Sequence, residues 1–380
     1  MNEFSKELLN WYDLNRRILP WREDPSPYHV WLSEIMLQQT RVEAVREYYQ
    51  RFIEKLPDIR ALADAPADTY LKLWEGLGYY SRVRNLHKAA SVIMEEYGGV
   101  MPSSSKELIR LPGIGPYTAA AIASIAYGEA VPAVDGNLLR VFARLSRYGE
   151  NIRTPAAQKA AVKFYKERMP DTGSAEESSM TEELNVTENL HFSGRRSKPG
   201  NPCGNFNQAL MDLGAMVCLP NSGPRCGYCP LASQCSIHKE LPGEELTLPV
   251  MPERAEKKTE YLTVFVIRCG GRTAVRKRPG RGLLAGLYEF PNTAGFLDDD
   301  EALKWLREHS VEPLRILRTK DAEHIFTHKI WKMRGYEVAA DPFKEEKIPF
   351  IMASGEEISE KFSIPSAFGP FLHKIRQEKH

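Results

Sequence analysis

A chain of 380 residues is long enough for two domains, and 42% hydrophobic with 10% aromatic residues is an ordinary globular composition. The formal net charge of +1 excludes a protein that coats nucleic acid by bulk charge, although a local basic groove remains possible. No apolar run approaches the roughly 18 residues of a membrane helix, and the N-terminus lacks a secretory signal. We therefore expect no membrane partner and a cytoplasmic protein whose six cysteines are reduced and free to bind metal.

Apolar residues recur at helical spacing through the first 235 residues. Pro20 ends the first of these patterns, and Ser104 with Glu107 resembles a capping box. The run after residue 116 is apolar nearly all round, as in a helix at the centre of a core. The expected helices lie at residues 4–12, 104–111, 117–127, 138–145 and 206–217. We therefore expect residues 1–235 to form a mainly α domain.

Residues 171–202 interrupt this helical pattern. The stretch begins acidic, ends basic and is rich in Ser, Thr, Asn and Gly, so we expect an exposed, mobile insertion. We favour a tolerated surface loop over a partner-binding segment, because long polar insertions are usually solvated.

The composition changes again after Cys235. Residues 236–258 hold three prolines and a charged run, which is typical of a linker. Two strands are then expected at 261–268 and 272–276, paired across two glycines. A helix near 299–309 and strands around 323–338 complete the pattern. Residues 259–380 are therefore expected to form a small α+β domain.

Four of the cysteines form a C-x7-C-x2-C-x5-C array, namely Cys218, Cys226, Cys229 and Cys235. Four thiols within 18 residues of a reduced chain indicate a metal centre rather than disulfides. Structural zinc and an iron–sulfur cluster are equally compatible with the spacing, since both take four thiolates. Either would fix the end of the helical domain, which is a structural role.

Residues 111–116 join two helices through a Pro-Gly-Ile-Gly-Pro turn, a helix–hairpin–helix pattern. Gly113 and Gly115 allow positive φ and close backbone approach, and the amides at the start of the next helix can hold a phosphate. A plain turn between two helices would use the same residue types. Taken alone, the turn favours a plain connection, and the sequence that follows it shifts the balance toward a nucleic-acid backbone site.

Two acids accompany this turn. Asp135 stands before the helix at 138–145, where the amides would keep a carboxylate ionised and able to stabilise a cation, although an N-cap role needs the same geometry. Glu34 lies in an apolar run at 30–39, where burial would raise its pKa and make it a general acid. On the exposed edge of that helix it would be an ordinary surface residue. One raised and one lowered carboxyl pKa suits the breaking of a glycosidic bond.

Together the hairpin, the VDGN element at 134–137 and the cysteine array resemble the endonuclease III superfamily of DNA glycosylases. Within it, the chain is similar to the MutY-type adenine DNA glycosylases in five further motifs. These are LPWR at 19–22, WLSE at 31–34, MLQQT at 36–40, GLGYY at 76–80 and FNQALMDLG at 206–214. The resemblance spans nearly the whole chain outside the insertion.

The resemblance implies a role for each matching residue. Glu34 matches the acid that protonates the adenine ring nitrogen and later activates water, and Asp135 the carboxylate that stabilises the oxocarbenium-like sugar. Tyr117 and Asn137 match residues that support this charge and the water. Residues matching the DNA interface are Gln39 and Tyr79, which fill or wedge the duplex, Trp21, Arg22 and Gln208, which surround the flipped adenine, and the hairpin glycines Gly113 and Gly115.

The resemblance also implies that the four cysteines hold a [4Fe–4S] cluster. The first cysteine spacing is one residue longer than the commonest pattern, a difference that a loop can absorb. In bifunctional relatives a lysine at the position of Tyr117 attacks the sugar. Because Tyr117 has no amine, we expect base removal without strand cleavage.

Residues 259–380 resemble the Nudix-like domain with which these enzymes check for 8-oxoguanine opposite adenine. Phe326, Thr327 and His328 match its Phe-Ser-His loop, with threonine replacing serine. The acidic helix of a working Nudix hydrolase is absent, because residues 297–305 read LDDDEALKW. The implied partner is duplex DNA with adenine opposite 8-oxoguanine or guanine, bound by a monomer associated with the nucleoid.

The leading hypothesis is thus a monofunctional adenine glycosylase of base excision repair, with a helix–hairpin–helix domain and a Nudix-like domain. One alternative is an endonuclease III-like glycosylase with lyase activity, against which Tyr117 and the second domain speak. The other is a non-catalytic DNA-binding module, against which the retention of both Glu34 and Asp135 speaks.

Overall fold

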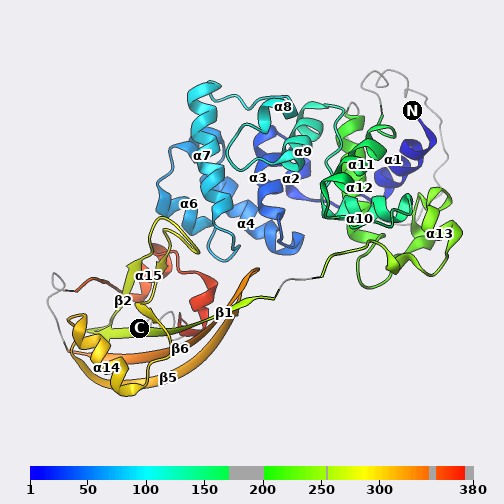
Figure 1. Ribbon diagram of the computed structural model, residues 1–380. Helices are drawn as coiled ribbons and strands as arrows, with labels where there is room; N and C mark the ends of the chain where they lie inside the picture. The colour runs from blue at the N-terminus through cyan, green and yellow to red at the C-terminus, as the bar shows by residue number, and fades with distance from the viewer. Residues whose placement is uncertain (171–200, 254–255, 342–347, 373–380) are drawn as a thin grey trace, which may run out of the picture. The chain divides into compact units, whose positions relative to one another are not determined.

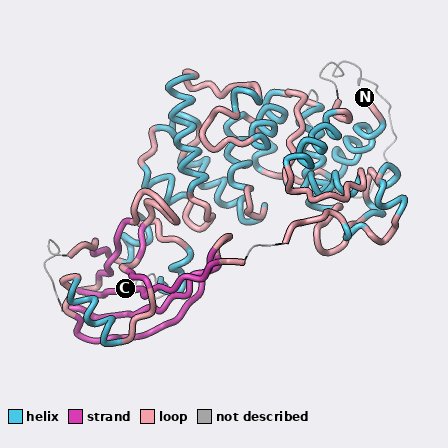
Figure 2. Tube along the Cα trace, viewed as in Figure 1, coloured by secondary structure: helices cyan, strands magenta, loops and turns pink. Residues whose placement is uncertain are grey.

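The computed structural model describes residues 1–170, 201–253, 256–341 and 348–372. Almost all of the expected insertion, residues 171–200, lies outside the described residues. The chain forms two compact units, which we name the helical unit (1–53, 57–63 and 85–253) and the sheet unit (54–56, 64–84 and 254–380). They differ plainly in secondary structure (Figure 2). Among the described residues, no helix is both long and apolar enough to cross a bilayer.

The helical unit contains most of the helices labelled in Figure 1. In chain order these are α1 (Glu3–Asn15), α2 (Pro20–Glu23), α3 (Pro27–Leu37), α4 (Val42–Lys55), α5 (Ile59–Ala63), α7 (Ser81–Glu96), α8 (Ser105–Leu108), α9 (Pro116–Tyr127), α10 (Gly136–Leu145), α11 (Pro155–Lys166), α12 (Pro202–Met216) and α13 (Ser236–Glu240), with the 3₁₀ turns η2 (Cys226–Tyr228), η3 (Ala232–Gln234) and η4 (Glu245–Thr247). The last two residues of α4 and the first four of α7 belong to the sheet unit. The helices expected at 4–12, 117–127, 138–145 and 206–217 are confirmed by α1, α9, α10 and α12.

Several of these helices begin in the same way, with a polar cap followed by proline. Ser26 before α3, Thr154 before α11 and Asn201 before α12 each accept a backbone amide of the first turn. Proline at the first helical position loses no hydrogen bond there and presets the backbone angle. These local signals fix where the helices start, and packing fixes where their apolar faces go.

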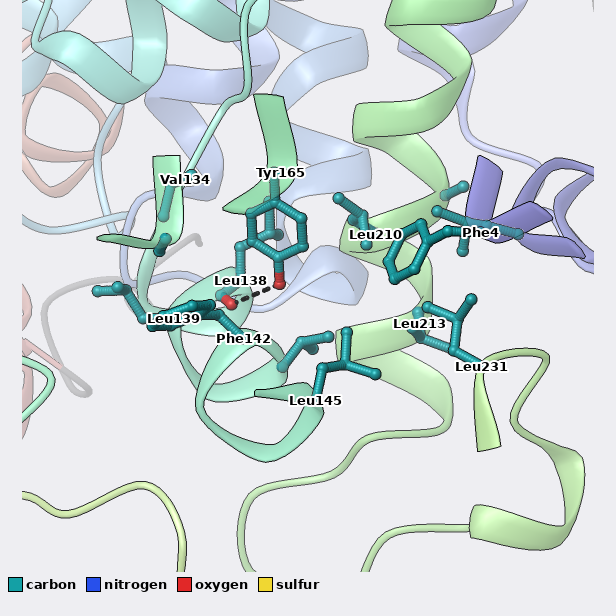
Figure 3. Packing of buried hydrophobic residues seen from close by; sticks show 14 of the residues in the cluster. Phe4, Val134, Leu138, Leu139, Phe142, Leu145, Tyr165, Leu210, Leu213 and Leu231 are labelled. Carbon is teal, nitrogen blue, oxygen red and sulfur yellow. Dashed lines mark hydrogen bonds between the residues drawn. The ribbon is translucent and has the colours of Figure 1, made fainter. Parts of the chain in front are cut away.

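The helix α9 lies at the centre of the helical unit. Its residues Thr118–Ile125 are all buried, as expected for a helix that is apolar all round. It packs against α3 and α12, and α12 packs in turn against α1 and α10 (Figure 1). Figure 3 shows the adjoining core, where Leu138 and Phe142 of α10 face Leu210 and Leu213 of α12. This packing brings the N-termini of α9 and α10, which carry Tyr117 and Asp135, close to α3.

Two expectations need correction. The helix expected to run to residue 111 is the single turn α8, because the backbone turns into the hairpin through bonds from Leu111 N to Leu108 O and from Ile114 N to Leu111 O. Residues 236–253 of the expected linker contain α13 and η4 and belong to the helical unit, where Ile237 and Leu248 are buried in its core. The limits of the two domains otherwise remain a prediction.

The sheet unit is built on one mixed sheet. Within the described residues it has seven strands, β1 (Lys258–Cys269), β2 (Arg272–Lys277), β3 (Tyr288–Glu289), β4 (Asn292–Ala294), β5 (Pro313–Ile325), β6 (Lys329–Ala340) and β7 (Ile351–Ala353). The order is β3-β2-β1-β6-β5, with β4 also paired to β1 and β7 to β2. The central strands β1 and β6 are parallel, and the other pairs are antiparallel.

Apolar side chains cover both faces of β1, so the sheet is a middle layer. On one face, α14 (Asp299–Glu308) packs Ala302 and Leu306 against β1 and β6. On the other, α15 (Gly355–Glu360), η6 (Ser366–Phe368) and α16 (Gly369–Leu372) contribute Ile358, Phe368 and Leu372 respectively. The sheet unit also includes α6 (Ala67–Leu73). The predicted hairpin is confirmed, since Gly270 and Gly271 join β1 to β2 with positive φ.

Candidate active site and metal centre

A pocket of about 610 Å³ opens in the helical unit beside α3, α9, α10 and α12. Eight of the residues singled out in the sequence line it, namely Trp21, Arg22, Glu34, Gln39, Tyr117, Asp135, Asn137 and Gln208. Residues that are 101 positions apart in the sequence, Glu34 and Asp135, thus share one cavity. Neither hairpin glycine lines this pocket, and the four cysteines surround a separate cavity.

Glu34 is the more deeply buried of the two acids in this pocket. The residue is only 6% exposed, which excludes the ordinary surface position that its helix also allowed. Burial raises the pKa of Glu34 to about 7, and the charge of Asp135 adds to this. The hydroxyl of Tyr117, which donates to Glu34 Oε2 at 2.6 Å, and the charge of Arg22 both lower this pKa. A carboxyl with this pKa can give or take a proton near neutral pH.

Asp135 is the N-cap of α10, as the sequence predicted. Its carboxylate accepts the Leu138 amide at 2.8 Å and the side-chain amide of Asn137 at 3.0 Å. Burial nevertheless raises the pKa of Asp135, because desolvation outweighs these hydrogen bonds and the charge of Arg140. The expectation of a lowered pKa was therefore wrong. The pKa values of Glu34 and Asp135 are both raised, and the two residues differ in the contacts that support the charged form.

The cap of α10 continues into a chain of hydrogen bonds. Arg140 Nη1 donates to Asn137 Oδ1 at 3.1 Å, and Asn137 donates to Asp135. The same guanidinium donates through Nε to the carbonyl oxygen of Cys218 at 3.0 Å and through Nη2 to that of Gly214 at 2.8 Å. Arg140 thus connects the backbone of a cysteine to the carboxylate of the pocket.

One wall of the pocket is charged in a way that the sequence did not reveal. Arg22 directs Nη1 and Nη2 at the two carboxylate oxygens of Asp212, at 2.8 and 3.0 Å. Arg17 donates to the same carboxylate through its backbone amide and through Nε at 2.7 Å. Trp21 is buried beside them and packs its ring edge against Tyr49. Arg22 is therefore held by Asp212 before any ligand arrives.

Both predicted wedge residues have an unusual backbone. Gln39 has φ 57° and Tyr79 has φ 47°, in the left-handed region that side chains other than glycine rarely adopt. Tyr79 belongs to the sheet unit and is 45% exposed. Its hydroxyl lies 2.5 Å from Oγ1 of Thr327. Such strain persists only where the surrounding fold imposes it, and it often marks functional positions.

The predicted lesion-reading loop joins β5 to β6. The amide of Phe326 donates to the carbonyl oxygen of Lys329 at 2.8 Å, and Lys257 Nζ donates to the carbonyl oxygen of Phe326 at 2.9 Å. The ring of Phe326 packs edge-on against Trp331. Thr327 and His328 are exposed at the tip of this loop.

Glycine suits positions 113 and 115 of the hairpin for different reasons. Gly113 has φ 77°, and a Cβ there would lie 2.5 Å from Asn85 Cβ, so only glycine suits the position. Gly115 is the N-cap of α9 with φ −87°, so the positive φ that glycine allows is adopted at Gly113 and not at Gly115. A Cβ at Gly115 would meet open space. Its exposed backbone leaves the start of α9 accessible to an anion.

The four cysteines of the array line one small cavity, together with Arg144, His238 and Glu245. Burial and the neighbouring thiols raise the pKa of Cys229 to about 12. Burial, followed by Glu245 and the other thiols, raises the pKa of Cys226 to about 11. Such a group of thiols resists ionisation unless a cation is present, which metal binding would supply.

Arg144 supports the same interpretation. Its side chain is 2% exposed, and Nη1 donates to Cys218 Sγ at 3.3 Å. The other terminal nitrogen, Nη2, is buried without a hydrogen-bond partner among the described residues. A buried cation with an unused donor, lining the same cavity as the four thiols, fits an anionic metal–thiolate centre. His238 and Glu245 lie close to Cys226 and form a further group of possible ligands.

Each unit of the chain matches a known protein family. Residues 32–167 match the HhH-GPD superfamily of base excision DNA repair proteins, and residues 263–374 match the NUDIX domain. An adenine DNA glycosylase of Buchnera aphidicola is 32% identical over 86% of this chain and 83% of its own length. One of Mus musculus is 33% identical over 89% of this chain and 71% of its own length.

The chain belongs to the adenine DNA glycosylase family.

A further relative and a solved structure are also similar to this adenine DNA glycosylase family member. The human member is 35% identical over 76% of this chain and 57% of its own length, so it is the longer protein. Among solved structures, a thermostable thymine-DNA glycosylase matches with a TM-score of 0.50 and 27% identity, over 62% of this chain and 95% of its own.

Four charged residues of this adenine DNA glycosylase family member were not predicted from the sequence. These are Arg17, Arg140, Arg144 and Asp212. Asp212 could have been found, because it stands in an apolar helix just as Glu34 does. Arg17 follows another arginine and Arg140 and Arg144 lie one helical turn apart, so all three resemble ordinary surface charges in the sequence.

Proposed function

We propose that this chain removes adenine from duplex DNA by hydrolysing its N-glycosidic bond, in the pocket that contains Glu34 and Asp135. The single observation that carries the proposal is the meeting of these two acids in one cavity, one of them bonded to Tyr117. The family to which the chain belongs supports adenine as the base. The substrate is duplex DNA with adenine opposite 8-oxoguanine or guanine.

Glu34 is the general acid in this proposal. With a pKa of about 7, a substantial fraction is protonated at neutral pH, and its proton passes to a ring nitrogen of the flipped adenine. The electron pair of the glycosidic bond then moves onto the base, which leaves as neutral adenine. Positive charge remains on the sugar. The resulting Glu34 carboxylate can take a proton from the water that attacks the sugar carbon, which restores the acid.

Asp135 stabilises the cationic sugar. Its carboxylate is fixed by the Leu138 amide and by Asn137, so it need not reorganise as charge develops. Burial disfavours the free carboxylate, and a nearby cation would relieve that cost. Asp135 therefore favours the charged transition state over the neutral ground state.

The cysteines hold a [4Fe–4S] cluster in this proposal. Cys218, Cys226, Cys229 and Cys235 supply the four thiolates, and Arg144 supplies a buried cation beside them. The cluster fixes the fold at the end of the helical unit and takes no part in base removal. In the sheet unit, Phe326, Thr327 and His328 contact the base opposite adenine, and the exposed hydroxyl of Thr327 replaces that of serine.

Single-turnover cleavage assays test the proposal. Duplexes with adenine opposite 8-oxoguanine, guanine or thymine are incubated with excess protein, with and without later alkali. We expect alkali-dependent strand breaks with 8-oxoguanine and guanine, because Tyr117 has no amine to attack the sugar. Breaks without alkali would favour the lyase alternative. No adenine release from any of the three duplexes would overturn the proposed function.

A further inference from the structure

A second buried carboxylate lies behind the pocket wall. Asp212 stands in the middle of α12, among apolar neighbours, and is completely buried. It does not line the pocket, so it cannot contact a ligand there. An ionised carboxylate is retained in such a place only when it is paired, and the residues that pair with it show what it holds.

Asp212 holds two arginines that do line the pocket. Arg22 on α2 makes a two-pronged contact with it, at 2.8 and 3.0 Å. Arg17, in the loop between α1 and α2, donates Nε at 2.7 Å and its backbone amide at 3.1 Å. Arg22 also donates to the carbonyl oxygen of Arg17 at 3.3 Å. We call these three residues the Asp212 triad.

The Asp212 triad carries a net positive charge. Two guanidinium groups against one carboxylate leave one net positive charge on the pocket wall. Although burial raises it, the pKa of Asp212 is lowered overall by Arg22 and Arg17, so Asp212 is ionised at neutral pH. Burial raises the pKa of Tyr12 on α1, and the negative charge of Asp212 adds to this rise.

Glu34 is the group that this charge reaches. The groups facing Glu34 are Tyr117 from α9, Asp135 at the start of α10, and Arg22 from α2. The charge of Arg22 favours the ionised form of Glu34, whereas burial and Asp135 oppose it. The charge of Arg22 therefore influences whether Glu34 keeps its proton. Asp212 fixes the orientation of Arg22 and compensates part of its positive charge.

We propose that Asp212 is a positioning residue which, by holding Arg17 and Arg22 against the pocket wall, limits the positive charge facing Glu34 and so sets the pH range in which Glu34 keeps its proton. This inference rests on the proposed function, in which Glu34 is the acid. Without Asp212, the positive charges of Arg22 and Arg17, which line the same pocket as Glu34, would be uncompensated and would favour loss of the proton from Glu34. The carboxylate thus acts on the reaction without touching the substrate.

Two substitutions with opposite effects on the triad test the inference. Asp212→Asn removes the negative charge and keeps the shape, so the alkaline limb of the rate profile should move to lower pH by roughly half a unit. Arg17→Gln removes one positive charge and leaves the Arg22–Asp212 pair, so the limb should move to higher pH. Asp212→Glu restores the charge and should return the limb toward that of the wild type. Glu240→Gln breaks an exposed pair with Arg147 and serves as the control.

A merely structural role would give a different result. If Asp212 only held the fold together, Asp212→Asn would lower the rate equally at every pH and the limb would not move. Unmoved limbs in both Asp212→Asn and Arg17→Gln would overturn the inference. Should Asp212→Asn fail to fold, the direction of the shift in Arg17→Gln decides.

A titration of Glu34 separates this inference from the proposed function. The carboxyl band of Glu34 is followed by infrared difference spectroscopy, with Glu34→Gln as the blank, in the wild type and the triad variants. We expect the titration midpoint to move as the rate profile does. A wild type without adenine release would contradict the proposed function alone, whereas a Glu34 midpoint that is the same in all variants would contradict the positioning role.

Discussion

The hydroxyl of Tyr117 donates to Oε2 of Glu34 at 2.6 Å in the pocket that both residues line, where Glu34 is only 6% exposed. Burial raises the pKa of Glu34, and this hydrogen bond partly offsets the rise by stabilising the carboxylate. The balance leaves the pKa at about 7. The pair therefore holds a carboxyl poised for proton transfer at the pH of the cell.

The rate of adenine release should follow a bell-shaped curve against pH. Glu34 must be protonated, so the rate should be high below its pKa of about 7 and fall as the pH rises above it. Asp135 must be ionised, and because its pKa is raised, the acid limb should begin above the ordinary range of an aspartate. Single-turnover rates measured from about pH 5 to about pH 9 cover both limbs of the curve. A rate that climbs steadily above pH 8 would contradict the assignment of Glu34, for which about 7 is the midpoint.

Replacing Tyr117 with phenylalanine should move the alkaline limb to higher pH. The hydrogen bond that lowers the pKa of Glu34 is lost, so the carboxyl keeps its proton longer. The plateau rate should fall by about 10- to 100-fold, since one charge-assisted hydrogen bond is lost. Tyr127→Phe is the matched control, because Tyr127 lies on the same helix and its hydroxyl donates to the Met101 carbonyl. A limb that moves equally in both variants would exclude a specific effect.

Replacing Glu34 with glutamine should stabilise the fold at alkaline pH. Because the folded pKa of about 7 lies above the reference value of 4.5, the folded state binds the proton more tightly. Glu34 therefore costs stability progressively as the pH rises between these two values, and fully above the higher one. The gain from Glu34→Gln should grow from about 1 kcal/mol near pH 5 to about 3 kcal/mol near pH 8. Denaturant unfolding across this range measures it, and a gain independent of pH would argue against a buried charge.

Replacing Arg144 with glutamine should weaken metal retention. The variant loses the buried cation that donates to Cys218 Sγ, and losing such a support typically costs about 10–100-fold in metal affinity. Iron content and visible absorbance after mild chelation measure the loss, independently of activity. Arg147→Gln, on the exposed side of the next turn, should behave as the wild type. Equal iron loss in both variants would show that Arg144 does not support metal binding. Zinc in place of iron would contradict the assignment of a [4Fe–4S] cluster.

Much of the site could be predicted from local sequence signals. Asp135 before an amphipathic helix, Glu34 within an apolar run and the cysteine spacing each carry their chemistry in a few adjacent residues. The resemblance then connected positions that no local pattern could connect. The structure adds that Glu34 and Asp135 line one pocket, which depends on how α3, α9 and α10 pack.

The rest could not be predicted because it depends on tertiary surroundings. Asp135 has the hydrogen bonds expected of a cap, yet burial decides the direction of its pKa shift. Arg17 and Arg140 resemble surface charges in the sequence and acquire their roles only through Asp212 and Cys218, which lie far away along the chain. Long-range ion pairs of this kind leave no periodic signal.

The most direct test of the central claim, that Glu34 delivers the proton that releases adenine, is the amount of free adenine formed in a single turnover. Wild type and Glu34→Gln are each incubated with a duplex holding adenine opposite 8-oxoguanine, and the released base is quantified by mass spectrometry. We expect wild type to release adenine and Glu34→Gln to be slower by about 10²–10⁴-fold while still binding the duplex. Equal rates in the two proteins would contradict the account.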